Sequence, residues 1–197
     1  YIFKKINGLV QEIRKQKTNP VEEESRVWLD SIKPRLTYLA QLLSGKSISI
    51  MPAETTGGWK GDQFFLPDSY SRAMTQKGNI DFYIYRVFYM YGQFCLQHFY
   101  TESVADKEAY IQSSSKSGEV IAFLDMEFPL FKELYASVLL AEENYCSQNK
   151  DKVSDSNSWL YGKWFVFDTI DIEAYQKLLD PIKKNTVADD KPKEEYT

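Results

Sequence analysis

The segment from Asn79 to Tyr100 places apolar residues on every side of the helix that its spacing predicts. It reads NIDFYIYRVFYMYGQFCLQHFY, and aromatic or aliphatic residues occupy most of its positions. A helix that is apolar all round is buried, because one covered face would leave the other faces in water. We therefore predict a central core helix that follows Asn79 and ends near Tyr100.

Before this helix, the spacing of apolar residues changes from helical to alternating. Residues 47–51 alternate isoleucine with serine, which is typical of a half-buried strand. Pro52 ends that strand, the glycine-rich residues 57–62 follow, and residues 63–66 form a second apolar run. We interpret the segment 47–66 as one small β-hairpin in which residues 57–62 are a long turn.

Helical spacing predicts further helices on both sides of the central one. They cover residues 1–17, 20–44, a short stretch up to 112, 119–127, 129–146 and 170–183. Pro20 suits the first helical position, and Gly45 suits a left-handed cap after residue 44. The run SSSKSG at 113–118 predicts a flexible loop, and the aromatic segment 159–165 is expected to fold back on the bundle.

These elements predict a mostly α fold of the α+β class. It is a helical bundle around a central apolar helix, with one small β-hairpin. At 197 residues, the chain has the length of one domain. We assign residues 1–185 to that single domain and residues 186–197 to a charged tail or linker.

Charge and cysteine content narrow the possible partners. Lys and Arg number 24 against 28 Asp and Glu, so the net charge is −4 and no basic face for nucleic acid is expected. Asp81 and Arg86 interrupt the central apolar run, which argues against membrane insertion.

Cys95 and Cys146 lack metal-type spacing, so we expect buried, reduced thiols, with a disulfide as the alternative. The absence of an Asn-x-Ser/Thr sequon favours a cytoplasmic location.

The sequence contains no set of residues that predicts an active site. His98 is the single histidine, so it has no His-x-x-x-His partner, and no Glu-x-x-His helper precedes it. A serine or cysteine triad would have to recruit the same His98, and no nucleophile elbow accompanies it. We therefore expect no catalytic residues and no cofactor, with His98 as the one candidate metal ligand.

The loop GGWKGD at 57–62 is the strongest candidate for a binding element. A phosphate-binding loop ends in Gly-Lys-Ser/Thr and opens into a helix, whereas this loop leads into a strand. An exposed Trp59 beside charged neighbours suits contact with a protein, because aromatic anchors concentrate in interfaces. The aromatic segment near the end of the bundle is the second expected contact. We predict five partner-binding residues: Trp59, Lys60, Asp62, Trp159 and Trp164.

Several features, taken in order, resemble the N-terminal region of NorD-type nitric oxide reductase activation proteins and the related CbbO proteins. A more distant similarity is to the N-terminal part of the cobaltochelatase CobT subunit. The matching pieces are LAQLLSGK, SISIMPA, GGWKGD, FFLP and the central helix from Asn79 to Phe99, about a third of the chain. The resemblance implies an adaptor that precedes a von Willebrand factor A domain and works with a MoxR-class AAA+ ATPase to activate a metalloenzyme. The metal motif of the A domain is absent from this sequence, since residues 155–158 read DSNS and do not follow its pattern.

The expected function is therefore that of a non-enzymatic protein-binding domain of a co-chaperone. Its partners would be the AAA+ ATPase, the target metalloenzyme, or both. Two alternatives stay open. One is a metal-binding or hydrolytic domain that uses His98 with carboxylates from other helices. The other is a surface-exposed or lipoprotein interaction domain whose signal sequence lies upstream.

Overall fold

Seven helices and six strands lie within residues 20–98, 106–149 and 156–164, which are the residues that the computed structural model describes. The helices are α2 (Pro20–Ser25), α3 (Leu29–Ser44), α4 (Gln76–Cys95), α5 (Asp106–Ser115), α6 (Ser117–Glu127), α7 (Phe131–Gln148) and α8 (Ser156–Tyr161). The strands are β1 (Val27–Trp28), β2 (Ser49–Ala53), β3 (Gly58–Lys60), β4 (Gln63–Pro67), β5 (Ser69–Tyr70) and β6 (Lys163–Trp164). Most of these residues are helical, so the mostly α, α+β prediction is confirmed.

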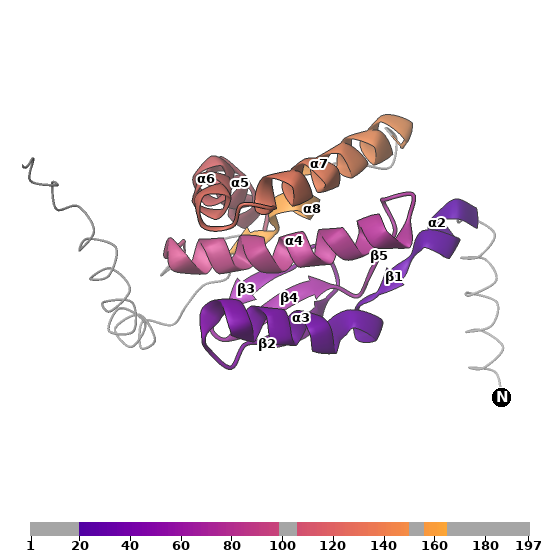
Figure 1. Cartoon of the computed structure of the whole chain (residues 1–197). Coiled ribbons are helices and arrows are strands. Elements are labelled where there is room, and N and C mark those ends of the chain that lie inside the picture. The colour runs from indigo at the N-terminus through magenta and orange to yellow at the C-terminus, as the bar shows by residue number, and fades with distance from the viewer. Residues whose placement is uncertain (1–19, 99–105, 150–155, 165–197) are drawn as a thin grey trace, which may run out of the picture.

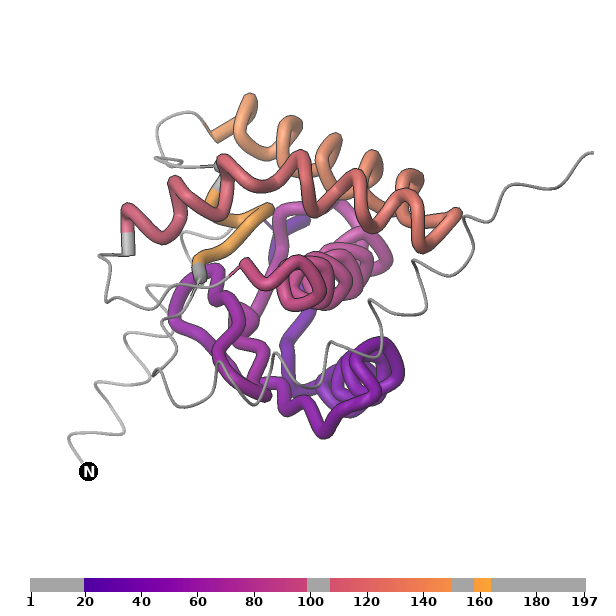
Figure 2. Tube along the Cα trace, turned by 90° about the vertical axis from the view of Figure 1, so that its left-hand side faces the viewer, coloured from indigo at the N-terminus to yellow at the C-terminus, as the bar shows by residue number. Residues whose placement is uncertain are grey.

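Helix α4 lies between two layers, as predicted for the central helix. Helix α3 and the strands cover one side, and α6, α7 and α8 pack on the other (Figure 1). A view along α4 shows the same arrangement, with α3 on one side and α5, α6 and α7 opposite (Figure 2). Six of its apolar side chains have no exposed surface: Phe82, Tyr83, Tyr85, Val87, Tyr89 and Met90. Burial on both sides removes a large aromatic area from water and provides most of the core.

The ends of α4 differ from the prediction. The helix begins at Gln76, because the Thr75 side chain accepts a hydrogen bond from the Gly78 N–H and caps it. It ends at Cys95, five residues earlier than predicted, and Gln97 then takes a left-handed conformation with φ of 57°.

The predicted hairpin of residues 47–66 is wrong in its pairing. Strands β2 and β4 are parallel neighbours, with Ile50 opposite Phe64, and the sheet order is β2-β4-β3-β6. The antiparallel partner of β4 is β3, whose residues the prediction gave to the turn. Gly57 explains the difference: a Cβ there would lie 2.0 Å from the Phe65 carbonyl oxygen, so glycine lets the chain pass close to β4 and start a third strand.

The single helix predicted for residues 20–44 is interrupted. Strand β1 separates α2 from α3 and pairs with β5, with Val27 opposite Tyr70. Trp28, at the end of β1, is 52% exposed. The helical spacing continues through this break, so the pattern alone could not reveal it. The predicted cap at Gly45 is confirmed: its φ is 64° and its N–H donates to the Gln41 carbonyl.

The predicted loop at 113–118 is helical except for Lys116. Ser113 is fully buried, and its hydroxyl accepts from the Gln93 amide at 2.9 Å and donates to the Tyr161 carbonyl at 3.0 Å. Serine has a modest helix propensity, but these buried hydrogen bonds give the helical position a tertiary partner. The expectation of a flexible linker here is therefore wrong.

Residues 156–164 fold back on the bundle, as predicted for the aromatic segment. Arg86 of α4 holds them in place: its Nη1 donates to the Leu160 carbonyl at 2.7 Å, and its Nη2 lies 3.5 Å from the Thr56 carbonyl. Arg86 is fully buried, and this burial lowers its pKa. Gly162 makes room for it, since a Cβ there would lie 2.0 Å from Nη2.

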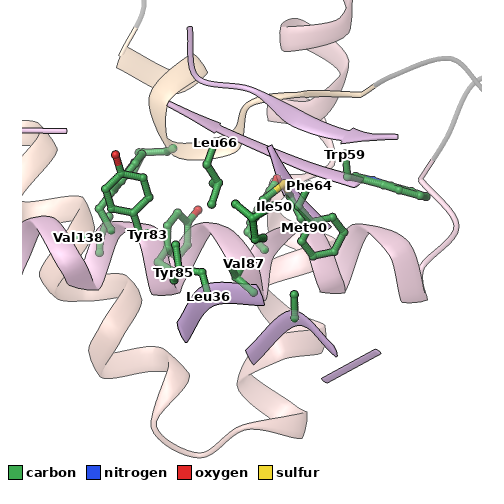
Figure 3. Packing of buried hydrophobic residues seen from close by; sticks show 14 of the residues in the cluster. Leu36, Ile50, Trp59, Phe64, Leu66, Tyr83, Tyr85, Val87, Met90 and Val138 are labelled. Atoms are coloured by element: carbon green, nitrogen blue, oxygen red, sulfur yellow. The ribbon is translucent and has the colours of Figure 1, made fainter. Parts of the chain in front are cut away.

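The core is continuous across α3, the sheet, α4 and α7. Figure 3 shows Ile50, Phe64 and Met90 close together with Trp59 beside them, and Leu36 of α3 belongs to the same cluster. Within the described part of the chain, no helix is long and apolar enough to cross a membrane. The helices predicted at 1–17 and 170–183 and the tail at 186–197 lie outside the described residues.

Candidate functional site

An open groove of about 690 Å³ lies between α2, residues 71–75 and α7. Three large apolar side chains from these elements line it: Val21, Met74 and Leu140. They are 45%, 73% and 59% exposed, although most residues of their type are buried in folded domains. Figure 1 shows α2 close to the beginning of α4, which also contributes to the groove. An apolar surface that converges from separate elements marks a binding surface more often than scattered exposed residues do.

Asn79 fixes two walls of the groove to the core. Its side-chain Nδ2 donates to the Ser25 carbonyl at 2.7 Å and to the Ala73 carbonyl at 3.0 Å, and its Oδ1 accepts from the Ala73 N–H at 2.8 Å. The side chain has no exposed surface, so these bonds do not compete with water. Asn79, predicted to precede the helix, lies inside α4 and positions the loop that carries Met74.

A buried ion pair ties the third wall to the same loop. Arg72 Nη1 lies 2.7 Å from Glu142 Oε2 of α7, and the two side chains are 11% and 2% exposed. The other oxygen of Glu142 accepts a hydrogen bond from the Tyr70 hydroxyl. Burial, together with the charge of Glu142, raises the pKa of Tyr70. The carboxylate therefore joins β5, the 71–75 loop and α7 into one rigid frame around the groove.

Aromatic rings surround the other side of Arg72. Its guanidinium carbon lies 3.8 Å from the Trp159 ring centroid and 4.9 Å from the Tyr145 ring centroid. A second cleft of about 340 Å³ begins here and is lined by Arg72, Tyr145 and Trp159 together with Glu54 and Asp68. The cleft and the groove share Ser71, Arg72 and Tyr145, so the two hollows adjoin. Trp159, one of the five predicted contact residues, lines this part of the surface.

The expectation of an exposed Trp59 is wrong. Trp59 is 2% exposed and makes an edge-to-face contact with Phe94 at 5.5 Å between ring centroids. It belongs to β3, which turns its ring into the core while the next residue, Lys60, faces solvent. An alanine at position 59 is therefore expected to destabilise the fold, and it cannot test a contact surface.

The remaining predicted contact residues are not brought to the groove. Lys60 and Asp62 are exposed at the turn between β3 and β4, and neither lines the groove or the cleft. The backbone of Trp164 pairs with that of Trp59 in the sheet. Lys60 and Asp62 therefore lie apart from the candidate site, whereas Trp159 lines its cleft.

His98 pairs with a carboxylate at the other end of α4. Its Nε2 lies 3.3 Å from Glu119 Oε2, and burial lowers the pKa of His98. Among the described residues, no group of three histidine, cysteine, aspartate or glutamate side chains could hold a metal ion. Cys95 and Cys146 are not bonded to each other and are partly buried, and burial raises the pKa of the Cys95 thiol.

The residues that build the groove were not singled out from the sequence. Leu140 gave a signal, because it is apolar although it lies outside the stripe that Phe131, Leu134 and Val138 form at helical spacing. Met74 gave a weaker one as a large apolar residue within a polar segment. The pair of Arg72 and Glu142 gave none, because the two residues are 70 positions apart and only tertiary folding joins them.

Comparison with known proteins gives no significant match: no family model fits the chain, and neither a curated protein nor a solved structure resembles it. The similarity to NorD and CbbO proteins therefore stays a prediction from the motifs of the sequence.

Proposed function

We propose that this chain is a non-enzymatic protein-binding domain that holds a segment of a partner in the groove between α2, residues 71–75 and α7. The groove with its three exposed apolar side chains is the observation that carries the proposal. Protein interfaces combine such an apolar centre with a polar rim. Here Asn144 and Gln148 of α7 line the same groove and supply amide groups beside Leu140.

The frame of the groove favours binding with little rearrangement. Asn79 and the pair of Arg72 and Glu142 connect its walls through buried polar contacts. A surface that is already ordered loses less conformational entropy when a partner binds, so more of the contact energy contributes to affinity. A shallow groove of this kind suits a peptide segment, whereas the clefts of small-molecule enzymes enclose most of their ligand.

The finer proposal is an adaptor of a co-chaperone in the cytoplasm. It rests on the motifs at 39–67 and 79–99, which resemble NorD and CbbO proteins. They make a MoxR-class AAA+ ATPase the first partner to test and its target metalloenzyme the second. In this proposal the domain contributes binding, and the ATPase supplies the energy for remodelling.

The test measures the affinity of the chain for a purified MoxR-class ATPase in the presence of ATP. Leu140→Asp places a charge in the apolar centre of the groove, and we expect it to weaken binding by about tenfold or more, since a central contact is worth more than about 1.4 kcal/mol. The control is Leu42→Asp, because Leu42 of α3 is 68% exposed and does not line the groove.

Both leucines are exposed, so both variants should keep the circular dichroism spectrum of the wild type. Equal affinities of the two variants for the ATPase would contradict the assignment of the groove as its binding surface.

A further inference from the structure

Carboxylates surround the groove and its adjoining cleft. Glu22 lines the groove, Glu24 lines a shallow hollow beside it, and Glu54 and Asp68 line the cleft. The salt bridges within the described residues include none of these four side chains. Within the described part of the chain, these four carboxylates therefore add negative charge to the surface without a salt-bridge partner.

Two cations among the described residues line this surface, and each already has a carboxylate partner. Arg26 Nε lies 3.3 Å from the Glu23 carboxylate, and Arg72 forms the 2.7 Å pair with Glu142. The positive charges that line the groove and the cleft therefore do not offset the four carboxylates. A ligand that reaches this surface meets an excess of negative charge beside exposed apolar side chains.

The cleft already stabilises one cationic side chain of the protein itself. The guanidinium of Arg72 packs against Trp159 at 3.8 Å from the ring centroid, which is the geometry of a cation–π contact. Glu54 and Asp68 line the same cleft as Trp159 and Tyr145. Aromatic rings beside carboxylates favour a cationic group, because both attract positive charge in a partly desolvated place.

We propose that the groove and the cleft together bind a peptide segment that carries apolar residues on one face and lysine or arginine beside them. This rests on the proposed function and specifies the chemistry of the partner. The apolar face lies on Val21, Met74 and Leu140, and a basic side chain enters the cleft near Glu54 and Asp68. Because the hollows share Ser71, Arg72 and Tyr145, one continuous segment reaches both.

The direct test uses two synthetic peptides and the full chain. The first is an amphipathic helix of about four turns, with leucine on one face and lysine on the other. The second has glutamate in place of every lysine. Fluorescence anisotropy at low salt measures the Kd of each peptide. We expect the glutamate peptide to bind at least about tenfold more weakly, because its charges repel the carboxylates.

Two variants with equal net charge separate the proposed surface from the overall acidity of the chain. Glu22→Gln with Asp68→Asn removes two carboxylates that line the groove and the cleft. Glu127→Gln with Glu133→Gln removes two exposed carboxylates outside both hollows. We expect the first variant to weaken the lysine peptide by about threefold to tenfold, and the second by less than about twofold.

Equal binding of both peptides, or equal losses in both charge variants, would overturn the proposal. So would an absence of peptide binding while Leu140→Asp still weakens capture of the ATPase. In that last case the groove remains a binding surface, and only the basic character of its ligand is wrong.

Discussion

Two arginines in this structure are buried in different ways. Arg86, at the centre of α4, is fully buried, and its hydrogen-bond acceptors are the backbone carbonyls of Leu160 and Thr56. Arg72, beside the groove, pairs with the carboxylate of Glu142 and packs against Trp159. Among the described residues, the first arginine therefore has backbone dipoles and the Tyr89 ring as partners, and the second has a full opposite charge.

This difference separates a structural role from a role in the site. Arg86 joins the segments around Leu160 and Thr56 to α4, and its contacts do not reach the surface. The pair of Arg72 and Glu142 has no net charge, so it holds α7 in place without cancelling the carboxylates at the rim of the groove. Arg86 thus completes the fold, whereas Arg72 shapes the groove.

Glu142→Gln is expected to have the largest effect on stability. It removes the charge that balances Arg72 while keeping the size of the side chain. Loss of one partner of a buried ion pair costs about 3–5 kcal/mol, because the other charge stays buried without compensation. The free energy of unfolding in urea, followed by circular dichroism, measures this loss.

The neighbouring Glu143 provides the matched control for that variant. It is exposed on the same helix, so Glu143→Gln should change the free energy of unfolding by less than about 0.5 kcal/mol. A loss below about 1 kcal/mol for Glu142→Gln would show that the ion pair does not hold the groove together, and the contrast between the two arginines would disappear.

Arg86→Met is expected to cost less, although Arg86 is the more deeply buried residue. The variant leaves the Leu160 carbonyl without its donor, at about 1–3 kcal/mol, but it also removes a charge from the interior, which offsets part of that cost. Urea unfolding should therefore show a smaller loss than for Glu142→Gln. Arg35→Met, at an exposed position of α3, serves as the control and should be nearly neutral. A loss larger than that of Glu142→Gln would mean that carbonyl dipoles stabilise a buried arginine better than a carboxylate does.

The central helix, the fold class and the return of the aromatic segment could be predicted from the sequence. The signals for such features are local in the sequence. Helix α4 is apolar on all sides, and Gly45, whose cap was also predicted, stands where a helix needs a left-handed residue. The strand pairing could not be predicted in this way. Alternation in 47–51 and the apolar run at 63–66 identify two strands, but the decision between parallel and antiparallel pairing depends on the close passage of Gly57 beside Phe65.

The candidate site was harder to predict than the fold, because residues distant in sequence build it. Trp159 was identified as a contact residue from its type, whereas its partner Arg72 lies in a polar segment without a pattern. Trp59 was assigned to the surface because glycines flank it, and those glycines instead allow a buried strand. Composition shows that an aromatic residue is present, and tertiary packing decides whether it faces the core or a partner.

Two cation–π contacts between arginine and tryptophan differ in distance and in burial, and smaller effects on stability are expected from them. Arg72 lies 3.8 Å from the Trp159 ring centroid within the partly buried site, whereas Arg26 lies 5.8 Å from the ring centroid of Trp28, which is 52% exposed. Trp159→Leu should lower the free energy of unfolding by about 1–2 kcal/mol, because it removes a partly desolvated cation–π contact and some packing. Trp28→Leu should lower it by less than about 0.5 kcal/mol. Thermal unfolding of the two variants measures the difference, and equal shifts in Tm would show that the rings around Arg72 are no more than exposed contacts.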